Sequence, residues 1–178
     1  MIYSLYHYYD ANRGPFRNLS GLTADEAALL SRQLVQEGRT FASRRSEDYM
    51  SIRRGLEAQA RAQFIAKGGQ PRTAYPHYMT LGVCDWLKTW YENPCVLRLD
   101  WDDIREDAIS FTYGDLFPTM RVQDRKPYRG QVYTKKEIVA VIEAYGFPQA
   151  WNANGEGGPE RYIEAQIWDE EEIRRFYA

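Results

Sequence analysis

The segment RYIEAQIW (residues 161–168), which follows a glycine-rich loop, has the alternating pattern of a β-strand. Because successive side chains of a strand point to opposite faces, Ile163, Ala165 and Ile167 share one face. The other face places a carboxylate and an amide, Glu164 and Gln166, between two aromatic side chains. Such neighbours can partly desolvate a carboxylate and direct it at one small ligand, as a single-carboxylate active site requires. The alternative interpretation is an amphipathic edge strand with a solvated polar face.

The remainder of the chain predicts an α+β fold in a single domain that covers residues 1–178. Capping boxes begin two helices, with Thr23 paired to Glu26 and Thr134 paired to Glu137. The predicted strands are 2–8, 75–81, 95–99, 108–113 and 161–168, and the predicted helices are 23–38, 47–66, 85–91, 134–145 and 168–177. Strands and helices do not alternate as in repeated βαβ units, which favours small mixed or antiparallel sheets with helical inserts.

The composition is rich in aromatic residues, with 14 Tyr and 5 Trp in an aromatic share of 15%. Tyrosine and tryptophan suit pockets and interfaces as well as cores. The formal net charge of −2 provides no global basic field for nucleic acid, although local basic patches stay open. The chain has two cysteines and two histidines, and their spacing fits no common zinc site, so we expect no metal.

The N-terminal residues lack the basic and then apolar pattern of a signal peptide. No stretch approaches the ~20 apolar residues of a membrane span. We therefore expect a cytoplasmic protein with reduced thiols and no membrane partner.

Two arginine pairs and one histidine are candidates for ligand binding. Arg44 and Arg45 precede the second predicted helix, and Arg53 and Arg54 lie on it. Adjacent helical residues are about 100° apart, so at most one of the second pair faces a given site. Guanidinium forks suit phosphate or pyrophosphate, and a solvated helix face is the alternative. His7, at the end of the first strand, can hold a ribose hydroxyl or an amide, or have a structural role.

An acidic run follows the strand 95–99 and comprises Asp100, Asp102, Asp103, Glu106 and Asp107. Such a run can bind Mg²⁺ in a nuclease. It is also typical of a solvated turn, where aspartate stabilises the start of a helix. The sequence contains none of the P-loop, G-x-G-x-x-G and G-x-S-x-G motifs, which disfavours the nucleotide-binding and hydrolase classes that depend on them.

Four segments, in their order along the chain, carry a family resemblance. They are LYH (5–7), GG with YPHY (68–69 and 75–78), CVLRL with ISFTYGD (95–99 and 109–115), and RYIE (161–164). Together they resemble the ADP-ribosyltransferases, and among these the DarT-type toxins, which use NAD to modify single-stranded DNA. The order of the segments is what carries the resemblance, since each motif is short.

The resemblance implies an NAD-dependent transferase that moves ADP-ribose to a macromolecular acceptor, nucleic acid or protein, without a metal. It assigns catalysis to Glu164, whose carboxylate would stabilise an oxocarbenium-like state. The residues that it assigns to NAD binding are His7, Arg44, Arg45, Arg53, Tyr75 and Tyr78. Gln166, on the same strand face as Glu164, would orient the acceptor. A toxin-like role, with an antitoxin or another regulatory partner, follows from the same resemblance.

Two other hypotheses stay open at the level of sequence. One is a non-catalytic protein that binds a protein or single-stranded nucleic acid through its aromatic surface. The other is a nuclease in which Glu164, Gln166 and an upstream aspartate hold Mg²⁺. The transferase hypothesis makes a geometric prediction. The strand of Glu164 should lie beside the strand of His7, or one strand away, with both side chains facing one ligand. Side chains on opposite faces of the sheet, or more than about 15 Å apart, would contradict the transferase hypothesis.

Overall fold

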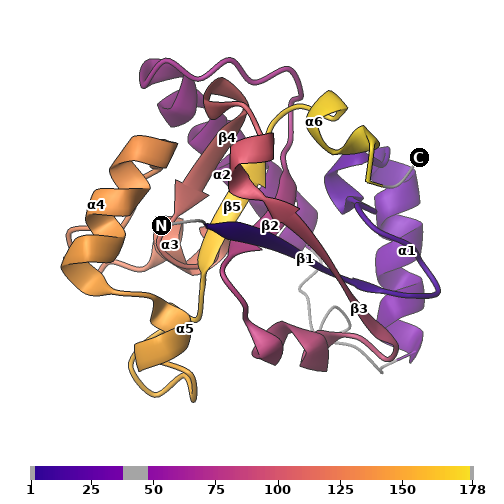
Figure 1. The fold of residues 1–178 in the computed structure, drawn as a ribbon. Helices are drawn as coiled ribbons and strands as arrows, with labels where there is room; N and C mark the ends of the chain where they lie inside the picture. The colour runs from indigo at the N-terminus through magenta and orange to yellow at the C-terminus, as the bar shows by residue number, and fades with distance from the viewer. Residues whose placement is uncertain (1–2, 38–47, 177–178) are drawn as a thin grey trace.

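Five strands form one antiparallel sheet in the order β3-β1-β2-β5-β4 (Figure 1). The computed structural model describes residues 3–37 and 48–176. The strands are β1 (Ser4–Asp10), β2 (His77–Leu81), β3 (Pro94–Asp100), β4 (Ile109–Thr112) and β5 (Ile163–Ile167). Each lies within about two residues of its predicted position, the usual uncertainty of element ends.

Strand β5, which carries Glu164, lies inside the sheet between β2 and β4. Its residues Ile163, Ala165 and Ile167 belong to the main hydrophobic core, which confirms the predicted alternation. All five of its residues are buried, so the interpretation as an edge strand with a solvated face is wrong. The polar side of β5 is covered by other parts of the chain, and any carboxylate there loses water.

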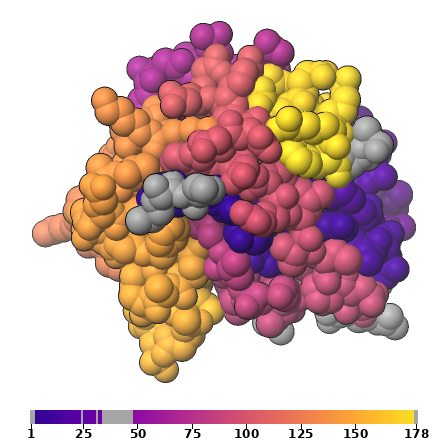
Figure 2. All heavy atoms as spheres, viewed as in Figure 1, coloured from indigo at the N-terminus to yellow at the C-terminus, as the bar shows by residue number. Residues whose placement is uncertain are grey.

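The helices lie on both faces of this sheet. They are α1 (Ala24–Glu37), α2 (Tyr49–Ala66), α3 (Leu116–Arg121), α4 (Lys135–Tyr145), α5 (Pro148–Trp151) and α6 (Glu171–Arg174). Helix α2 packs against Trp168 and Tyr78, on the polar side of β5, whereas α4 packs on the core side. Figure 1 shows α4 at the left and α2 behind the sheet, and Figure 2 shows α4 and α5 in orange on the left of the surface.

Capping residues and prolines explain which helices were predicted correctly from the sequence and which were not. The capping box of Thr134 and Glu137 is present at the start of α4, as predicted. The segment predicted as a helix at 85–91 is the 3₁₀ helix η3 (Asp85–Trp90), and only four residues of the predicted helix 168–177 are α-helical. The short helix α3 was not predicted, because it has only six residues and contains Pro118, which argues against a helix in the sequence. In the structure the side chain of Asp115 caps its N-terminus.

The acidic run folds into two 3₁₀ turns, η4 (Trp101–Asp103) and η5 (Glu106–Ala108). Asp103 pairs with Arg175, and Asp107 pairs with Arg105. These contacts are those of a charged surface turn. None of the described helices is long and apolar enough to cross a membrane. The predicted α+β class, with an antiparallel sheet and helical inserts in one small domain, is confirmed at this level.

Candidate active site

A cavity of about 750 Å³ opens where β1 and β2 separate. The two strands pair only at Leu5↔Leu81 and Tyr6↔Thr80, and β1 then continues along β3 while β2 continues along β5. Consecutive residues of both strands line the cavity. Its volume is in the range of small-molecule and cofactor sites, about 300–1,000 Å³. Its aromatic lining residues include Tyr6, Tyr8, Phe16, Tyr49, Tyr75, Tyr78 and Tyr162.

Glu164 forms part of the cavity wall and is only 6% exposed. Its Oε1 accepts hydrogen bonds from the Leu116 amide at 3.3 Å and from Gln166 Nε2 at 3.1 Å. Burial, followed by the nearby Asp115 carboxylate, raises the pKa of Glu164 well above its usual value, although Gln166 and Arg53 act in the opposite direction. The carboxyl group is therefore held in place and keeps its proton to a higher pH than an exposed glutamate.

Asp115 is a second carboxylate on the same wall, and it was not among the predicted site residues, although it ends one of the segments that carry the family resemblance. It caps α3 by accepting a hydrogen bond from the Phe117 amide. The Tyr162 hydroxyl donates to Asp115 Oδ2 at 2.9 Å and lies 3.5 Å from Glu164 Oε2. A phenol thus sits between two carboxyl groups, and repulsion between these groups favours a proton on one of them. A local signal in the sequence was a capping aspartate before an apolar stretch.

Gln166 lies behind Glu164 and not on the cavity wall, which corrects the prediction that it orients an acceptor. The side chain is fully buried, and its Oε1 accepts from the Ser110 hydroxyl at 2.9 Å. Its Nε2 donates to the Thr112 hydroxyl and to Glu164. Since these bonds use the amide within the sheet, Gln166 positions Glu164 instead of contacting a ligand.

His7 borders the cavity, but both of its ring nitrogens bind the main chain. Nδ1 donates to the Tyr78 carbonyl at 2.9 Å, and Nε2 accepts from the Phe16 amide at 2.8 Å. This tautomer is assigned from the hydrogen bonds. Burial lowers the pKa of His7 to about 4, although the bond to Tyr78 opposes the shift, so the ring is neutral near pH 7. The ring therefore links strand β2 to the loop that follows β1.

The predicted relation between His7 and Glu164 is correct for the strands and wrong for the side chains. Strand β1 lies one strand away from β5, with β2 between them, as expected. The register aligns Tyr6 with Thr80 and Thr80 with Glu164, so Tyr6 shares the face of Glu164. His7, the next residue, is on the opposite face at the edge of the gap. This is the arrangement that the prediction named as contrary to the transferase hypothesis, so the NAD contact that the resemblance assigned to His7 is withdrawn.

Of the four candidate arginines, Arg53 reaches the cavity. Arg44 and Arg45 lie outside the described residues, and Arg54 is exposed and donates to the Leu22 carbonyl. The Arg53 side chain is 11% exposed, and its guanidinium carbon lies 4.8 Å from the centre of the Tyr78 ring. The predicted separation of the two helical arginines is therefore confirmed.

Buried Glu57 explains why Arg53 can be held away from solvent. Arg53 Nε donates to Glu57 Oε1 at 2.9 Å, and the same oxygen accepts from the hydroxyls of Tyr78 and Ser20. The guanidinium also donates to the Tyr49 hydroxyl and to Asn18 Oδ1. Glu57 is only 1% exposed, so the solvated helix face that the sequence allowed describes Arg54 and not Arg53 or Glu57. Tyr75 and Tyr78, both predicted ligand-stacking residues, line the cavity and are half-buried.

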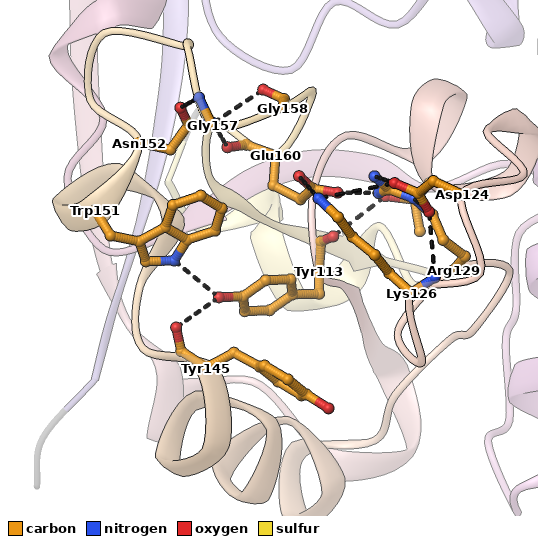
Figure 3. Close-up of polar contacts among 11 residues, drawn as sticks. Tyr113, Asp124, Lys126, Arg129, Tyr145, Trp151, Asn152, Gly157, Gly158 and Glu160 are labelled. Carbon is orange, nitrogen blue, oxygen red and sulfur yellow. Dashed lines mark hydrogen bonds and ion pairs between the residues drawn. The ribbon is translucent and has the colours of Figure 1, made fainter.

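A second buried carboxylate, Glu160, fixes the loop that leads into β5 (Figure 3). It forms ion pairs with Arg129 and Lys126, and Arg129 also pairs with Asp124. The side-chain amide of Asn152 donates to the carbonyls of Gly158 and Glu160, which closes the same loop. This cluster holds the chain four residues before Glu164, so it supports the position of the candidate carboxylate.

Within residues 3–37 and 48–176, no three His, Cys, Asp or Glu side chains group as ligands for a metal ion. Both cysteines, Cys84 and Cys95, are free thiols. The cytoplasmic location stays a prediction. Comparisons of the chain with protein-family models, with curated proteins and with solved structures gave no match.

Proposed function

We propose that this protein is an NAD-dependent ADP-ribosyltransferase, both in its activity and in its fold, with Glu164 as its catalytic carboxylate. The observation that carries the proposal is the setting of Glu164. It is buried on the wall of an aromatic-lined cavity large enough for a dinucleotide, and hydrogen bonds from Leu116 and Gln166 fix its orientation. Within the described part of the chain, no lysine or arginine forms an ion pair with it. Its carboxyl group is therefore available to a ligand.

The proposed reaction matches these surroundings. Cleavage of the bond between nicotinamide and ribose leaves positive charge on the ribose, and the nicotinamide departs with the bonding electrons. A buried carboxylate close to that ribose stabilises the charge more strongly than one in water. NAD itself carries a cationic nicotinamide ring, which favours the ionised form of Glu164 on binding. The acceptor then forms the new bond to ribose and loses a proton, for which the neighbouring Asp115 carboxylate is a suitable base.

Arg53 is the candidate partner of the NAD pyrophosphate. A guanidinium has five N–H donors, and the hydrogen bonds of Arg53 to Glu57, Tyr49 and Asn18 use three of them. Two donors are left for a phosphate oxygen, and the side chain is already oriented. Tyr75 and Tyr78 are candidates for stacking against the nicotinamide. His7 takes no direct part in this proposal, because its two nitrogens hold the cavity frame.

A second candidate function is binding of a single-stranded nucleic acid or a peptide without catalysis. Trp86 and Trp90 pack edge to face beside β1, and the Arg161 guanidinium lies 4.0 Å from the Trp86 ring centre. Bases stack on such aromatic groups without sequence preference. In the transferase proposal the same surface would receive the acceptor, whether nucleic acid or protein. An antitoxin or another regulatory partner belongs to the same proposal.

The test is a comparison of Glu164→Gln with Glu143→Gln, an exposed glutamate of α4. We expect release of nicotinamide from NAD to fall by roughly 10²–10³ in the first variant, the scale for loss of one electrostatic stabiliser. The control should behave like the parent. NAD should still raise the melting temperature of both variants, because most of its contacts are elsewhere. Unchanged turnover in Glu164→Gln would exclude Glu164 as the catalytic group, and a parent protein that neither binds NAD nor releases nicotinamide would favour the binding function.

The role of Arg53 is tested by the pair Arg53→Lys and Arg54→Lys. Lysine keeps the charge and loses the planar fork, so the first variant should lose about 1–3 kcal/mol of NAD affinity. The exposed Arg54 should contribute under about 0.5 kcal/mol. Equal small losses in both variants, abolished by salt, would indicate a diffuse basic surface instead of a pyrophosphate site.

A further inference from the structure

The Tyr162 hydroxyl lies between the two carboxyl groups of the cavity wall, and its single proton is directed at one of them. The residue directly precedes β5, is 4% exposed and packs in a cluster with Tyr8 and Leu87. Its oxygen lies 2.9 Å from Asp115 Oδ2, within the usual range of an O–H···O bond, and 3.5 Å from Glu164 Oε2, beyond that range. The phenol therefore donates to Asp115 and turns its lone pairs toward Glu164.

This arrangement keeps the phenol protonated and acts differently on the two carboxyl groups. Burial, followed by the charges of Asp115 and Glu164, raises the pKa of Tyr162 well above its usual value, so the phenol keeps its proton near neutral pH. A hydroxyl that donates to a carboxylate favours the charged form of that group, whereas lone pairs that face a carboxyl group favour its neutral form. Neutral Glu164 can in turn donate to the Tyr162 oxygen. The order Glu164, Tyr162, Asp115 is then a chain in which each O–H has an acceptor.

Both carboxyl groups are fixed in this chain from their other side. Asp115 Oδ1 accepts from the Phe117 amide at 2.8 Å as the cap of α3. Glu164 Oε1 accepts from the Leu116 amide at 3.3 Å. Each group therefore has one oxygen bound to the start of α3 and one oxygen that faces Tyr162, so neither can turn away from the phenol without losing a bond.

Other titratable and charged groups act on this chain from three further elements. Arg53 on α2 opposes the rise that burial and Asp115 cause in the pKa of Glu164. Tyr78 on β2 interacts electrostatically with Glu164, and Cys84, which precedes η3, interacts with Tyr162. Arg53 and Tyr78 stay in place when the Tyr162 hydroxyl is removed, so a change in the titration of Glu164 would report the phenol.

We infer that Tyr162 is a positioning residue that joins Asp115 and Glu164 into one acid–base pair and assigns the proton of the free cavity to Glu164. Its part in turnover rests on the proposed function. When NAD brings its cationic ring, Glu164 releases its proton to solvent, and Asp115 stays ionised as the base for the acceptor. The phenol keeps its own proton throughout and acts through the two carboxyl groups instead of contacting the reacting atoms.

The experiment follows the titration of Glu164 by ¹³C NMR in protein labelled at the glutamate carboxyl carbons, without NAD. Its signal is the one that Glu164→Gln removes. Tyr162→Phe removes the lone pairs that disfavour the charge, so the midpoint should move to lower pH by about one pH unit. Tyr8→Phe is the control, because Tyr8 is buried in the same cluster and its hydroxyl accepts from the Cys84 amide at 2.7 Å. It should keep the midpoint of the parent.

Asp115→Asn should reverse the effect of the phenol. Asparagine keeps an oxygen for the Phe117 amide, so α3 stays capped, and it places an N–H donor where Oδ2 faced the phenol. The Tyr162 proton then points to Glu164 and favours its charged form, which lowers the midpoint. Adding Tyr162→Phe to Asp115→Asn should raise the midpoint again, whereas a structural role of the hydroxyl would give the same sign in both backgrounds.

A comparison of Asp115→Asn with Asp115→Ser needs no change at Tyr162 and keeps the test open even where Tyr162→Phe does not fold. Serine also caps helices and removes the charge, but it brings no amide donor to the phenol. The midpoint of Glu164 should therefore be lower in Asp115→Asn than in Asp115→Ser. Equal midpoints would contradict the proposed direction of the chain.

The outcomes separate this inference from the proposed function. If Tyr162→Phe keeps the midpoint of the parent, or shifts it in the same direction in both backgrounds, the inference is wrong, whether or not the parent releases nicotinamide from NAD. If the midpoints move as expected and the parent releases nicotinamide, the pH at which kcat/KM rises should move with them. If the midpoints move and the parent releases no nicotinamide, the acid–base pair stands and the transferase proposal fails.

Discussion

Glu160 and Glu164 are four residues apart, are both buried, and have opposite surroundings. Glu160 is fully buried and forms ion pairs with Arg129 and Lys126 in the loop before β5. Glu164 lies on a cavity wall and is held by neutral donors, while the nearest guanidinium, that of Arg53, is bound to Glu57. A buried carboxylate paired with cations stabilises the fold, whereas one without a cation keeps its carboxyl group free to interact with a ligand.

Burial alone therefore does not identify a functional carboxylate. Gly158 has a positive φ, and a Cβ there would lie 2.9 Å from Glu160 Oε2, so the loop closes tightly around that carboxylate. The Glu164 carboxyl group instead borders open space in the cavity. Removal of the partners of each carboxylate should therefore have different consequences.

The largest expected effect is the loss of the Glu160 cluster. Arg129→Met removes a buried guanidinium and leaves Glu160 with Lys126 alone, which should lower the free energy of unfolding by about 3–5 kcal/mol. The exposed Arg121→Met, at the end of α3, is the control and should stay within about 0.5 kcal/mol of the parent. Denaturant unfolding measures both.

The double variant Glu160→Gln/Arg129→Met sharpens this test. Because the two side chains interact directly, the loss in the double variant should be smaller than the sum of the single losses. Additive losses, or a cost as small as that of Arg121→Met, would show that the cluster does not support the loop before β5.

A smaller effect is expected in the pH dependence of NAD affinity. The raised pKa of Glu164 means that the free cavity holds a proton above the usual range of a glutamate. A cationic nicotinamide ring prefers the carboxylate, so affinity should rise with pH, by at most about tenfold per pH unit, and level off above the pKa of the free protein.

Titration of NAD at several pH values measures this dependence in the parent and in Glu164→Gln. The variant should show no such slope. The titratable groups that influence Glu164 are Asp115, Tyr162, Tyr78 and Arg53. A slope of equal size in the variant would show that Glu164 is not the group whose proton is released on NAD binding.

The sequence predicted the elements and the strand of Glu164 because their signals are local. Capping boxes, the alternation in residues 161–168 and the apolar stripes of the helices all act within a few residues. The contacts of the site are not local. Tyr162 bonds Asp115 across 47 positions, and the Asn18–Arg53 bond spans 35 positions. No periodicity indicates such pairs.

Gln166 and His7, whose roles were predicted wrongly, show the same limit of local sequence signals. Gln166 has the correct strand face for a ligand contact, but Ser110 and Thr112 on the neighbouring strand use its amide. His7 has a suitable side chain at a strand end, but the separation of β1 from β2 turns its ring toward two main-chain groups. Alternation along one strand predicts a face, and only the neighbouring strands determine what that face contacts.

The smallest expected effect concerns the stability of Glu164→Gln. The pKa of Glu164 is raised in the folded protein, so the folded state keeps a proton that the unfolded chain loses near pH 4.5. The associated stabilisation is complete below that pH and is lost as the pH rises to the folded pKa.

An amide has no charge to bury and can keep the bonds from Leu116 and Gln166. Glu164→Gln should therefore be more stable than the parent by about 1 kcal/mol near pH 8 and should lack this pH dependence. Thermal and denaturant unfolding at pH 5 and pH 8 measure the difference. A loss of stability at pH 8, like that expected for Glu160→Gln, would mean that Glu164 is a structural carboxylate of the same kind as Glu160.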